Sequence, residues 1–188
     1  MIKKRKALPL ILWSLGIIGF ISYYPFLLLP RETFYQIGKT IYITGNHGCY
    51  HTGLRSSRFF LKGAVNLGST RRDAFDKLSS CYQLLGKPDK AEQTYTKALE
   101  YFPKDVEFYF CRGEIRKDLR DFKGALGDYN QTILLGNNSE YAESAFYGRG
   151  AMKYLLGDIM GANKDRTKAQ KLAGYEFRTY ADYCQLFQ

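Results

Sequence analysis

Small and large side chains recur along this chain at intervals of 34 and then 37 residues. Ala91, Ala125 and Ala162 each begin a set in which a large residue follows after four positions and a small one after seven. Spacings of three and four residues place side chains on one face of an α-helix. Because a fixed period near 34 residues is typical of stacked helical hairpins, the pattern predicts an all-α chain of paired helices.

Each set is preceded by a matching segment that predicts the first helix of its pair. These segments share aromatic residues, an Arg-Gly pair or a glycine at the turn. They are marked by Phe75, Tyr82 and Gly86, then by Tyr109, Arg112 and Gly113, then by Phe146, Arg149, Gly150 and Gly157. Two helices of about 13 residues each are too short to bury an apolar face alone, so the units must stack.

The three units resemble the tetratricopeptide repeat over residues 72–174. The second unit departs from that pattern with Asn137 in place of a closing proline, and the third with Arg166 in place of an aromatic residue. The resemblance implies a tetratricopeptide-like α-α superhelix, which is a solenoid of helical hairpins. Such solenoids present extended concave surfaces that hold other proteins.

A weaker copy of the unit precedes these three. Apolar and small residues, Leu61 among them, recur at helical spacing and predict a second helix over 56–67 with a partner over 32–43. The segment between them, 45–53, predicts a loop longer than a normal repeat turn. Residues 31–71 are therefore predicted as a degenerate hairpin with a long loop.

The last segment, residues 175–188, carries Tyr175, Thr179, Tyr183 and Phe187 at the spacing of one helix face. We expect it to form a capping helix, because a solenoid needs an end that covers its last apolar face.

The first 30 residues have a different pattern. Four basic residues at positions 3–6 precede an uncharged stretch from Leu8 to Leu29. As a helix this stretch would be about 33 Å long, enough to cross the hydrocarbon core of a bilayer. A cleavable signal peptide is the alternative, but the bulky residues at 23–26 do not make a small-residue cleavage site, so the pattern favours a retained anchor.

The charges beside this stretch predict its orientation. Four basic residues lie before it, whereas Arg31 and Glu32 cancel each other after it. The positive-inside rule then predicts a cytoplasmic N-terminus, with the repeats on the periplasmic side of a bacterial membrane or the lumenal side of a photosynthetic one.

The chain carries a formal net charge of +10. Five basic residues gather near the predicted anchor: Arg55, Arg58, Lys62, Arg71 and Arg72. Such a group suits anionic lipid headgroups or an acidic protein, and a solvated helix face is the alternative. The sequence has no motif of a nucleic-acid reader, so no nucleic acid partner is expected.

Both histidines of the chain lie close to a cysteine, as His47, Cys49 and His51. On an extended segment these three side chains could point one way and bind zinc or copper. A glycine-rich loop with two incidental histidines explains the same residues, and no fourth ligand is evident. No other metal or cofactor is predicted.

The cysteines form no Cys-x-x-Cys pair. Cys81 and Cys111 are expected on neighbouring first helices at different heights, too far apart for a disulfide. The sequence leaves open the disulfide state of all four cysteines, with free thiols as the default. They are Cys49, Cys81, Cys111 and Cys184. No nucleophile motif, phosphate loop or paired-carboxylate arrangement is present, so no catalytic residue is predicted and the chain is not expected to be an enzyme.

The resemblance implies that first helices line the concave face. Nine residues there avoid the core pattern and are predicted to contact a partner. They are Asp73, Asp76, Gln83, Glu107, Phe110, Glu114, Lys117, Tyr147 and Tyr154. Relatives that clamp a peptide's carboxylate use lysine and asparagine at such places, so these acidic residues suit a basic or amphipathic segment instead. Binding through the outer face is the alternative.

Together these features predict a membrane-anchored scaffold for protein–protein interaction. It would be a subunit or an assembly and stability factor of a membrane protein complex, for example a respiratory or photosynthetic one. The alternative is a periplasmic metal-binding or redox-active protein that uses His47, Cys49 and His51.

Overall fold

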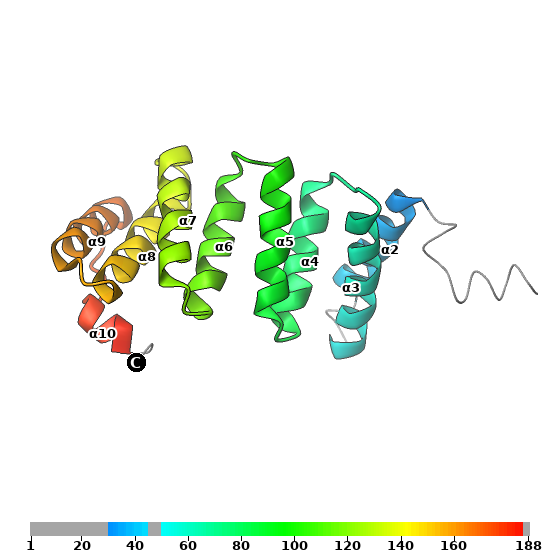
Figure 1. Cartoon of the computed structure of the whole chain (residues 1–188), viewed down its shortest axis with the longest axis horizontal. Helices are drawn as coiled ribbons and strands as arrows, with labels where there is room; N and C mark the ends of the chain where they lie inside the picture. Colours follow the sequence, from blue (N-terminus) through cyan, green and yellow to red (C-terminus); the bar gives the residue numbers. More distant parts are fainter. Residues whose placement is uncertain (1–29, 45–49, 186–188) are drawn as a thin grey trace, which may run out of the picture.

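A computed structural model describes residues 30–44 and 50–185, and it shows a stack of helical hairpins (Figure 1). The helices are α2 (Arg31–Thr44), α3 (Tyr50–Asn66), α4 (Arg72–Leu84), α5 (Pro88–Tyr101), α6 (Val106–Asp118), α7 (Phe122–Leu135), α8 (Ala142–Leu155), α9 (Ile159–Ala173) and α10 (Tyr180–Cys184). The predicted all-α solenoid of tetratricopeptide-like hairpins is confirmed.

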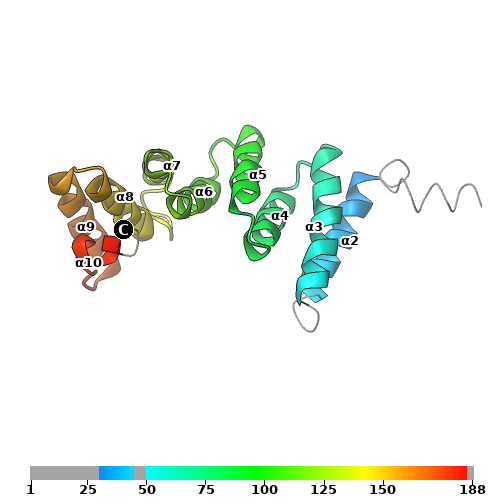
Figure 2. The ribbon, with the colours of Figure 1, turned by 60° about the horizontal axis from the view of Figure 1, so that its bottom comes forward.

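The hairpins follow one another along a single axis (Figure 2). Each helix packs mainly against its neighbours in sequence, from α2 with α3 through to α8 with α9. The first helices also reach one another: α2 contacts α4, and α6 contacts α8. No comparable contact joins the second helices α3, α5, α7 and α9 within the described residues. The first helices therefore line the inner surface of the stack.

Local sequence signals set the ends of these helices. Asp121 and Asp158, which are 37 positions apart, cap α7 and α9 by accepting hydrogen bonds from the backbone N–H groups of Gly124 and Gly161. A side-chain oxygen at this position satisfies an N–H that has no partner inside the helix. The turn before α7 holds Arg120 at φ 63°, where the first unit has Gly86 at φ 65°.

Small residues let aromatic rings pass between helices. Tyr129 on α7 is fully buried, and its ring lies against Gly113 on α6 and Gly148 on α8. A Cβ atom at position 148 would lie only 2.8 Å from Cζ of Tyr129. The third glycine of this kind, Gly150, makes room for Tyr180 on α10.

Two buried carboxylates repeat in the second and third units. Asp128 on α7 lies 2.6 Å from the Arg112 guanidinium, and Asp165 on α9 lies 2.6 Å from that of Arg149. Each has a second cation close by, so neither negative charge is buried without a partner. These clusters tie the first helix of a unit to its second.

The N-terminal hairpin differs from its predicted bounds. Helix α3 begins at Tyr50, so residues 50–53 are helical and the predicted loop over 45–53 was too long. Its glycines suggested a loop, but Leu54 is buried and holds the first turns of α3 in the core. Burial of an apolar face outweighs the low helix propensity of Gly53.

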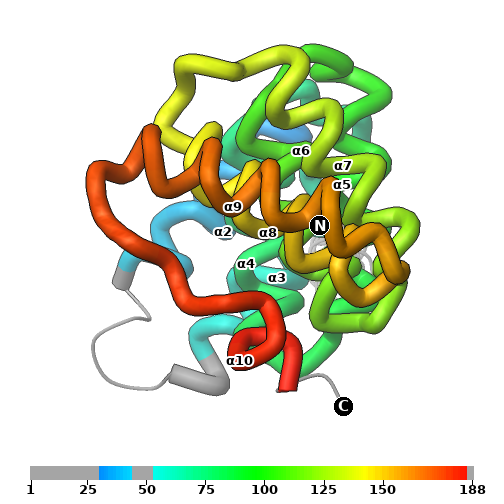
Figure 3. The backbone as a smooth tube through the Cα atoms, turned by 90° about the vertical axis from the view of Figure 1, so that its left-hand side faces the viewer, coloured from blue at the N-terminus to red at the C-terminus, as the bar shows by residue number. Residues whose placement is uncertain are grey.

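The predicted C-terminal helix begins later in the structure. Gly174 adopts φ 76° and ends α9, and among the described residues that follow, 175–185, an α-helix forms over 180–184, which Thr179 caps. A left-handed residue at a helix C-terminus redirects the chain, and glycine takes that conformation without strain. Figure 3 shows the segment leaving α9 and crossing to α10.

In the part of the chain that the structure describes, no helix is long and apolar enough to cross a membrane. The predicted anchor from Leu8 to Leu29 lies outside the described residues and stays a prediction.

We expect Gly148→Ala to lower the free energy of unfolding by about 1–3 kcal/mol, the usual cost of overpacking a well-filled core. The new methyl group would meet the ring of Tyr129, which is buried and cannot move aside. The midpoint of urea denaturation of the full chain measures this change.

Gly127→Ala is the matched control, because Gly127 lies within α7 with no atom near its absent Cβ. Alanine there should stabilise the chain by about 0.5–1 kcal/mol through helix propensity alone. Equal effects of the two substitutions would contradict the close approach of α7 and α8.

Candidate partner-binding site

The predicted partner-binding residues lie on the first helices α4, α6 and α8. Helix α4 carries Asp73, Asp76 and Gln83; α6 carries Glu107, Phe110, Glu114 and Lys117; α8 carries Tyr147 and Tyr154. Several of these side chains already form hydrogen bonds or ion pairs with other groups of the chain.

Two predicted acidic residues, Asp73 on α4 and Glu107 on α6, lie in ion pairs. Asp73 accepts a hydrogen bond from the Tyr35 hydroxyl and lies 4.0 Å from Lys39 Nζ. Glu107 accepts from the guanidinium of Arg72. These carboxylates are therefore at least partly neutralised by cations of the same chain.

Glu114 lies at the centre of a second group. Its two carboxylate oxygens accept hydrogen bonds of 2.5 Å from the Tyr129 hydroxyl and from Lys117 Nζ. Lys117 is itself mostly buried, and its Nζ lies 3.4 Å from the hydroxyl of Tyr183. Glu114 and Lys117 thus join the inner surface to the buried core.

Asp76 differs from the other three acidic residues, because it has no ion-pair partner within 4 Å among the described residues. Its carboxylate accepts a hydrogen bond of 3.2 Å from the Tyr95 hydroxyl. Burial raises the pKa of Asp76, and the nearby charge of Glu107 raises it further. The charges of Lys77 and Arg72 act on it only from a distance, and they do not offset the cost of burial. A half-buried carboxylate with no cation in direct contact is costly to the fold, which makes it a candidate for function.

The acidic side chains converge near Cys111 on α6. Burial raises the pKa of the Cys111 thiol to about 11, and the charges of Glu107, Asp76 and Glu114 add to this shift. Phe110, the preceding residue, packs against Tyr141 with ring centres 5.2 Å apart and the rings tilted by 40°. We call Asp76, Glu107, Phe110 and Glu114 the acidic–aromatic surface. It extends over α4 and α6.

The chain's own C-terminal segment contacts the predicted residues of α8. Phe177 stacks on Tyr147 with ring centres 4.5 Å apart, and the Tyr147 hydroxyl donates to the carbonyl of Arg178. Tyr154 lies 6.2 Å from the ring of Tyr180. These contacts could not be predicted from the sequence. The contact of Tyr180 with Gly150 on α8 joins two separate helices, so it does not follow the spacing of one helix face.

The predicted basic group is divided in the structure. Arg71 pairs with Glu32 on α2 at 2.7 Å, and Arg72 pairs with Asp105 at 2.5 Å and also with Glu107. These two arginines are therefore compensated. The basic residues of α3 form a separate group: Arg55, Arg58 and Lys62.

Of the predicted metal ligands, His47 and Cys49 lie outside the described residues. His51 lies in the first turn of α3, so it is not part of the extended segment that the prediction required. Among the residues that the structure describes, no cluster of three or more histidine, cysteine or acidic residues could hold a metal ion.

The described cysteines Cys81, Cys111 and Cys184 carry free thiols. Burial raises the pKa of each thiol above its ordinary value. A thiol that stays protonated is a weak nucleophile, so this environment does not activate any of the three.

No family model matches the chain. The fold is similar to that of several solved structures. A MamA protein has a TM-score of 0.64 and 20% identity, covering 85% of this chain and 82% of MamA. YrrB, described as a tetratricopeptide repeat protein with an unusual peptide-binding site, has a TM-score of 0.57 and 19% identity, covering 72% and 68%.

The first tetratricopeptide domain of the Spaghetti protein, solved with an HSP90 peptide, has a TM-score of 0.53 and 25% identity. That match covers 58% of this chain and 84% of the domain. These similarities place the chain among tetratricopeptide-like helical-repeat folds.

We expect Asp76→Asn to stabilise the fold increasingly as the pH rises. The folded-state pKa of Asp76 is raised, so the folded chain binds the proton more tightly than the unfolded chain does. Wild-type stability therefore falls as the pH rises through this pKa, and asparagine removes that loss. Urea denaturation of both chains at about pH 3 and at neutral pH measures the difference.

Glu100→Gln is a suitable control, because Glu100 is exposed on α5 and its pKa shows no resolved shift. Its effect should stay small at both pH values. A stability difference for Asp76→Asn that does not change with pH would show that the carboxylate is not destabilised by burial.

Proposed function

We propose that this protein is a membrane-anchored scaffold that holds a protein partner on its acidic–aromatic surface. It serves as a subunit, or as an assembly and stability factor, of a membrane protein complex, for example a respiratory or photosynthetic one. The stretch from Leu8 to Leu29 anchors it, with the N-terminus in the cytoplasm and the repeats on the periplasmic or lumenal side.

The observation that carries the proposal is the half-buried carboxylate of Asp76, which has no ion-pair partner within 4 Å among the described residues and feels the negative charge of Glu107. A lysine or arginine of a partner would supply the missing positive charge, and an apolar group beside it would pack on the ring of Phe110. The partner's binding segment is therefore basic or amphipathic.

The structural neighbours support a binding role. YrrB is described as having a peptide-binding site, and the Spaghetti domain was solved with a bound peptide. Their shared architecture, a stack of short hairpins, exposes long surfaces on which a partner segment can lie. We propose the same kind of role for this chain, and no catalytic one.

We expect Asp76→Asn to weaken retention of the partner about tenfold, which corresponds to about 1.4 kcal/mol of binding free energy. The measurement is a pull-down of the full chain in mild detergent, with quantitative mass spectrometry of the proteins that accompany it. Because the same substitution should raise stability at neutral pH, loss of the partner would not reflect unfolding.

Glu100→Gln again serves as the control, since it removes a carboxylate away from this surface. Retention of the partner by Asp76→Asn at wild-type level would contradict the role of this surface. Recovery of the chain alone from wild-type membranes would contradict a stable scaffold.

The proposed topology has its own test. We expect a cysteine at exposed position 123, introduced as Lys123→Cys in a Cys49→Ser background, to react with a membrane-impermeant maleimide in intact cells. The other three cysteines, Cys81, Cys111 and Cys184, should react slowly, because their thiols have raised pKa values. Gel-shift labelling measures the reacted fraction.

Lys6→Cys in the same background reports the other side of the membrane. It should react only after the cells are permeabilised with detergent. The reverse result, with position 6 labelled in intact cells and position 123 protected, would overturn the orientation.

A further inference from the structure

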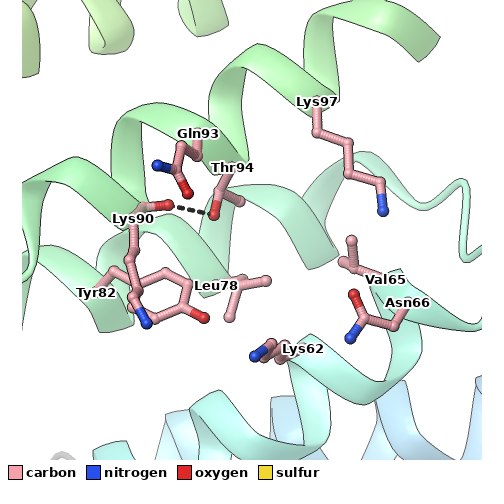
Figure 4. A pocket seen from close by; sticks show the side chains of 9 residues that line it. All are labelled: Lys62, Val65, Asn66, Leu78, Tyr82, Lys90, Gln93, Thr94 and Lys97. Carbon is pink, nitrogen blue, oxygen red and sulfur yellow. Dashed lines mark hydrogen bonds between the residues drawn. The ribbon is translucent and has the colours of Figure 1, made fainter.

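A hollow of about 210 Å³ opens on the other side of the stack, between α3, α4 and α5 (Figure 4). Its floor is apolar and comes from Val65, Leu78 and Tyr82. Lys62 of α3 lies on one side of this floor, and Lys90 and Lys97 of α5 lie on the other. We call this site the lysine-rimmed hollow.

The lysines of the rim are uncompensated. None of the nine residues that line the hollow is acidic. Among the described residues, Lys62, Lys90 and Lys97 form no ion pair. By contrast, every arginine of α4, α6 and α8 is paired with a carboxylate. The rim therefore carries three positive charges around an apolar floor.

The later units show what normally fills this position. At the places of Leu78 and Thr94 in the first unit, the second unit has Arg112 and Asp128, and the third has Arg149 and Asp165. There the side chains form the buried ion clusters, with hydrogen bonds onward to the preceding helix, as from Arg112 to Thr96.

In the first unit the same place holds leucine, threonine and Tyr82, so no ion cluster forms. Thr94 bonds only within its own helix, to the carbonyl of Lys90 at 2.7 Å. The counterpart of Thr96 one unit earlier is Lys62. Leucine and threonine in place of the arginine–aspartate pair thus remove the ion cluster, and lysine in place of threonine adds a cation to the rim.

The positive charge continues along α3. Arg55 and Arg58, with Lys87 from the turn before α5, surround a second recess beside the first. The guanidinium of Arg58 lies 5.8 Å from the ring of Tyr82, and its Nε is buried with no hydrogen-bond partner among the described residues. An unpaired buried donor on a cation favours an anionic ligand.

We propose that the lysine-rimmed hollow binds an acidic peptide segment of another protein, with one apolar side chain on the floor and carboxylates on either side. Lys90 and Lys97 are two helical turns apart, about 10 Å. On an extended segment, carboxylates two residues before and two after a central apolar side chain face the same way and lie about 13 Å apart, within reach of these flexible lysines. The segment would therefore alternate acidic residues with a central leucine, methionine or phenylalanine.

The chain itself cannot supply this segment. The stretches that the structure leaves undescribed, residues 1–29, 45–49 and 186–188, contain no aspartate or glutamate. A flat bilayer surface is also a poor fit, because headgroup charges in a plane do not place an apolar group on a floor that lies between the cations. The site is separate from the acidic–aromatic surface, so this proposal does not rest on the proposed function.

The test uses the full chain in mild detergent and a fluorescent peptide with a single leucine between pairs of glutamates. We expect saturable binding that weakens with added salt, measured by fluorescence anisotropy. Changing Lys62, Lys90 and Lys97 together to alanine should weaken binding about tenfold or more, as the loss of close charge pairs does. A peptide with serine in place of leucine should also bind more weakly.

A triple alanine variant of Lys123, Lys164 and Lys171 is the matched control, because these lysines are exposed elsewhere and the net charge changes equally. Gln93→Trp is a second variant, which fills the hollow and keeps every charge. The proposal predicts that the control binds as wild type does and that Gln93→Trp does not bind.

Equal affinities of the two triple variants would overturn the proposal. Short-chain phosphatidylglycerol is the competitor that tests for a lipid site. If it displaces the peptide at concentrations well below the peptide concentration that gives half-saturation, the proposal is overturned in favour of a lipid site. Asp76→Asn should leave peptide affinity unchanged, which separates this result from the test of the inner surface.

Discussion

The contact of Tyr129 with glycines on two neighbouring helices sets the geometry on which the rest of the stack depends. Its ring fills the space that Gly113 and Gly148 leave open, and its hydroxyl holds Glu114 at 2.5 Å. Close packing of this kind fixes the helices relative to one another, because a buried ring cannot shift without moving the helices around it. The Tyr129 side chain therefore sets the spacing of α6 and α8. It also orients Glu114, which is a predicted binding residue.

A second constraint is the choice between an ion cluster and an apolar contact inside each unit. Asp128 and Asp165 are nearly inaccessible to solvent, and paired arginines make their burial tolerable. The first unit replaces the pair with Leu78 and Thr94 and needs no such compensation. The exchange keeps the fold, since both solutions join the two helices, and in the first unit the apolar solution lines a recess. Variation of this kind gives one repeat a surface that its neighbours lack.

The sequence predicted the parts of this fold that repeat. Periodic alanines and aromatic residues located the hairpins from α4 to α9, because each unit must bury the same face against the next. Features that occur once were harder. Helix α3 begins inside a glycine-rich stretch because Leu54 is buried. Tyr180 of α10 packs against Gly150 of α8, although α9 lies between these helices in the sequence. The partner-binding residues were predicted because they do not fit the core pattern. That criterion cannot reveal that Arg72 already neutralises Glu107.

The two candidate surfaces differ in how their charges are balanced. On the inner side three of the four predicted acidic residues form ion pairs with cations of the same chain, and Asp76 has no such partner within 4 Å among the described residues. On the opposite side the three lysines around the hollow lack ion pairs in the described residues. Long-range attraction of a partner should therefore come from the lysine side, where charge is unscreened by neighbours, and close fit from the inner side. A rigid stack between two surfaces of opposite character can hold two different segments at a fixed separation, which is what a scaffold requires.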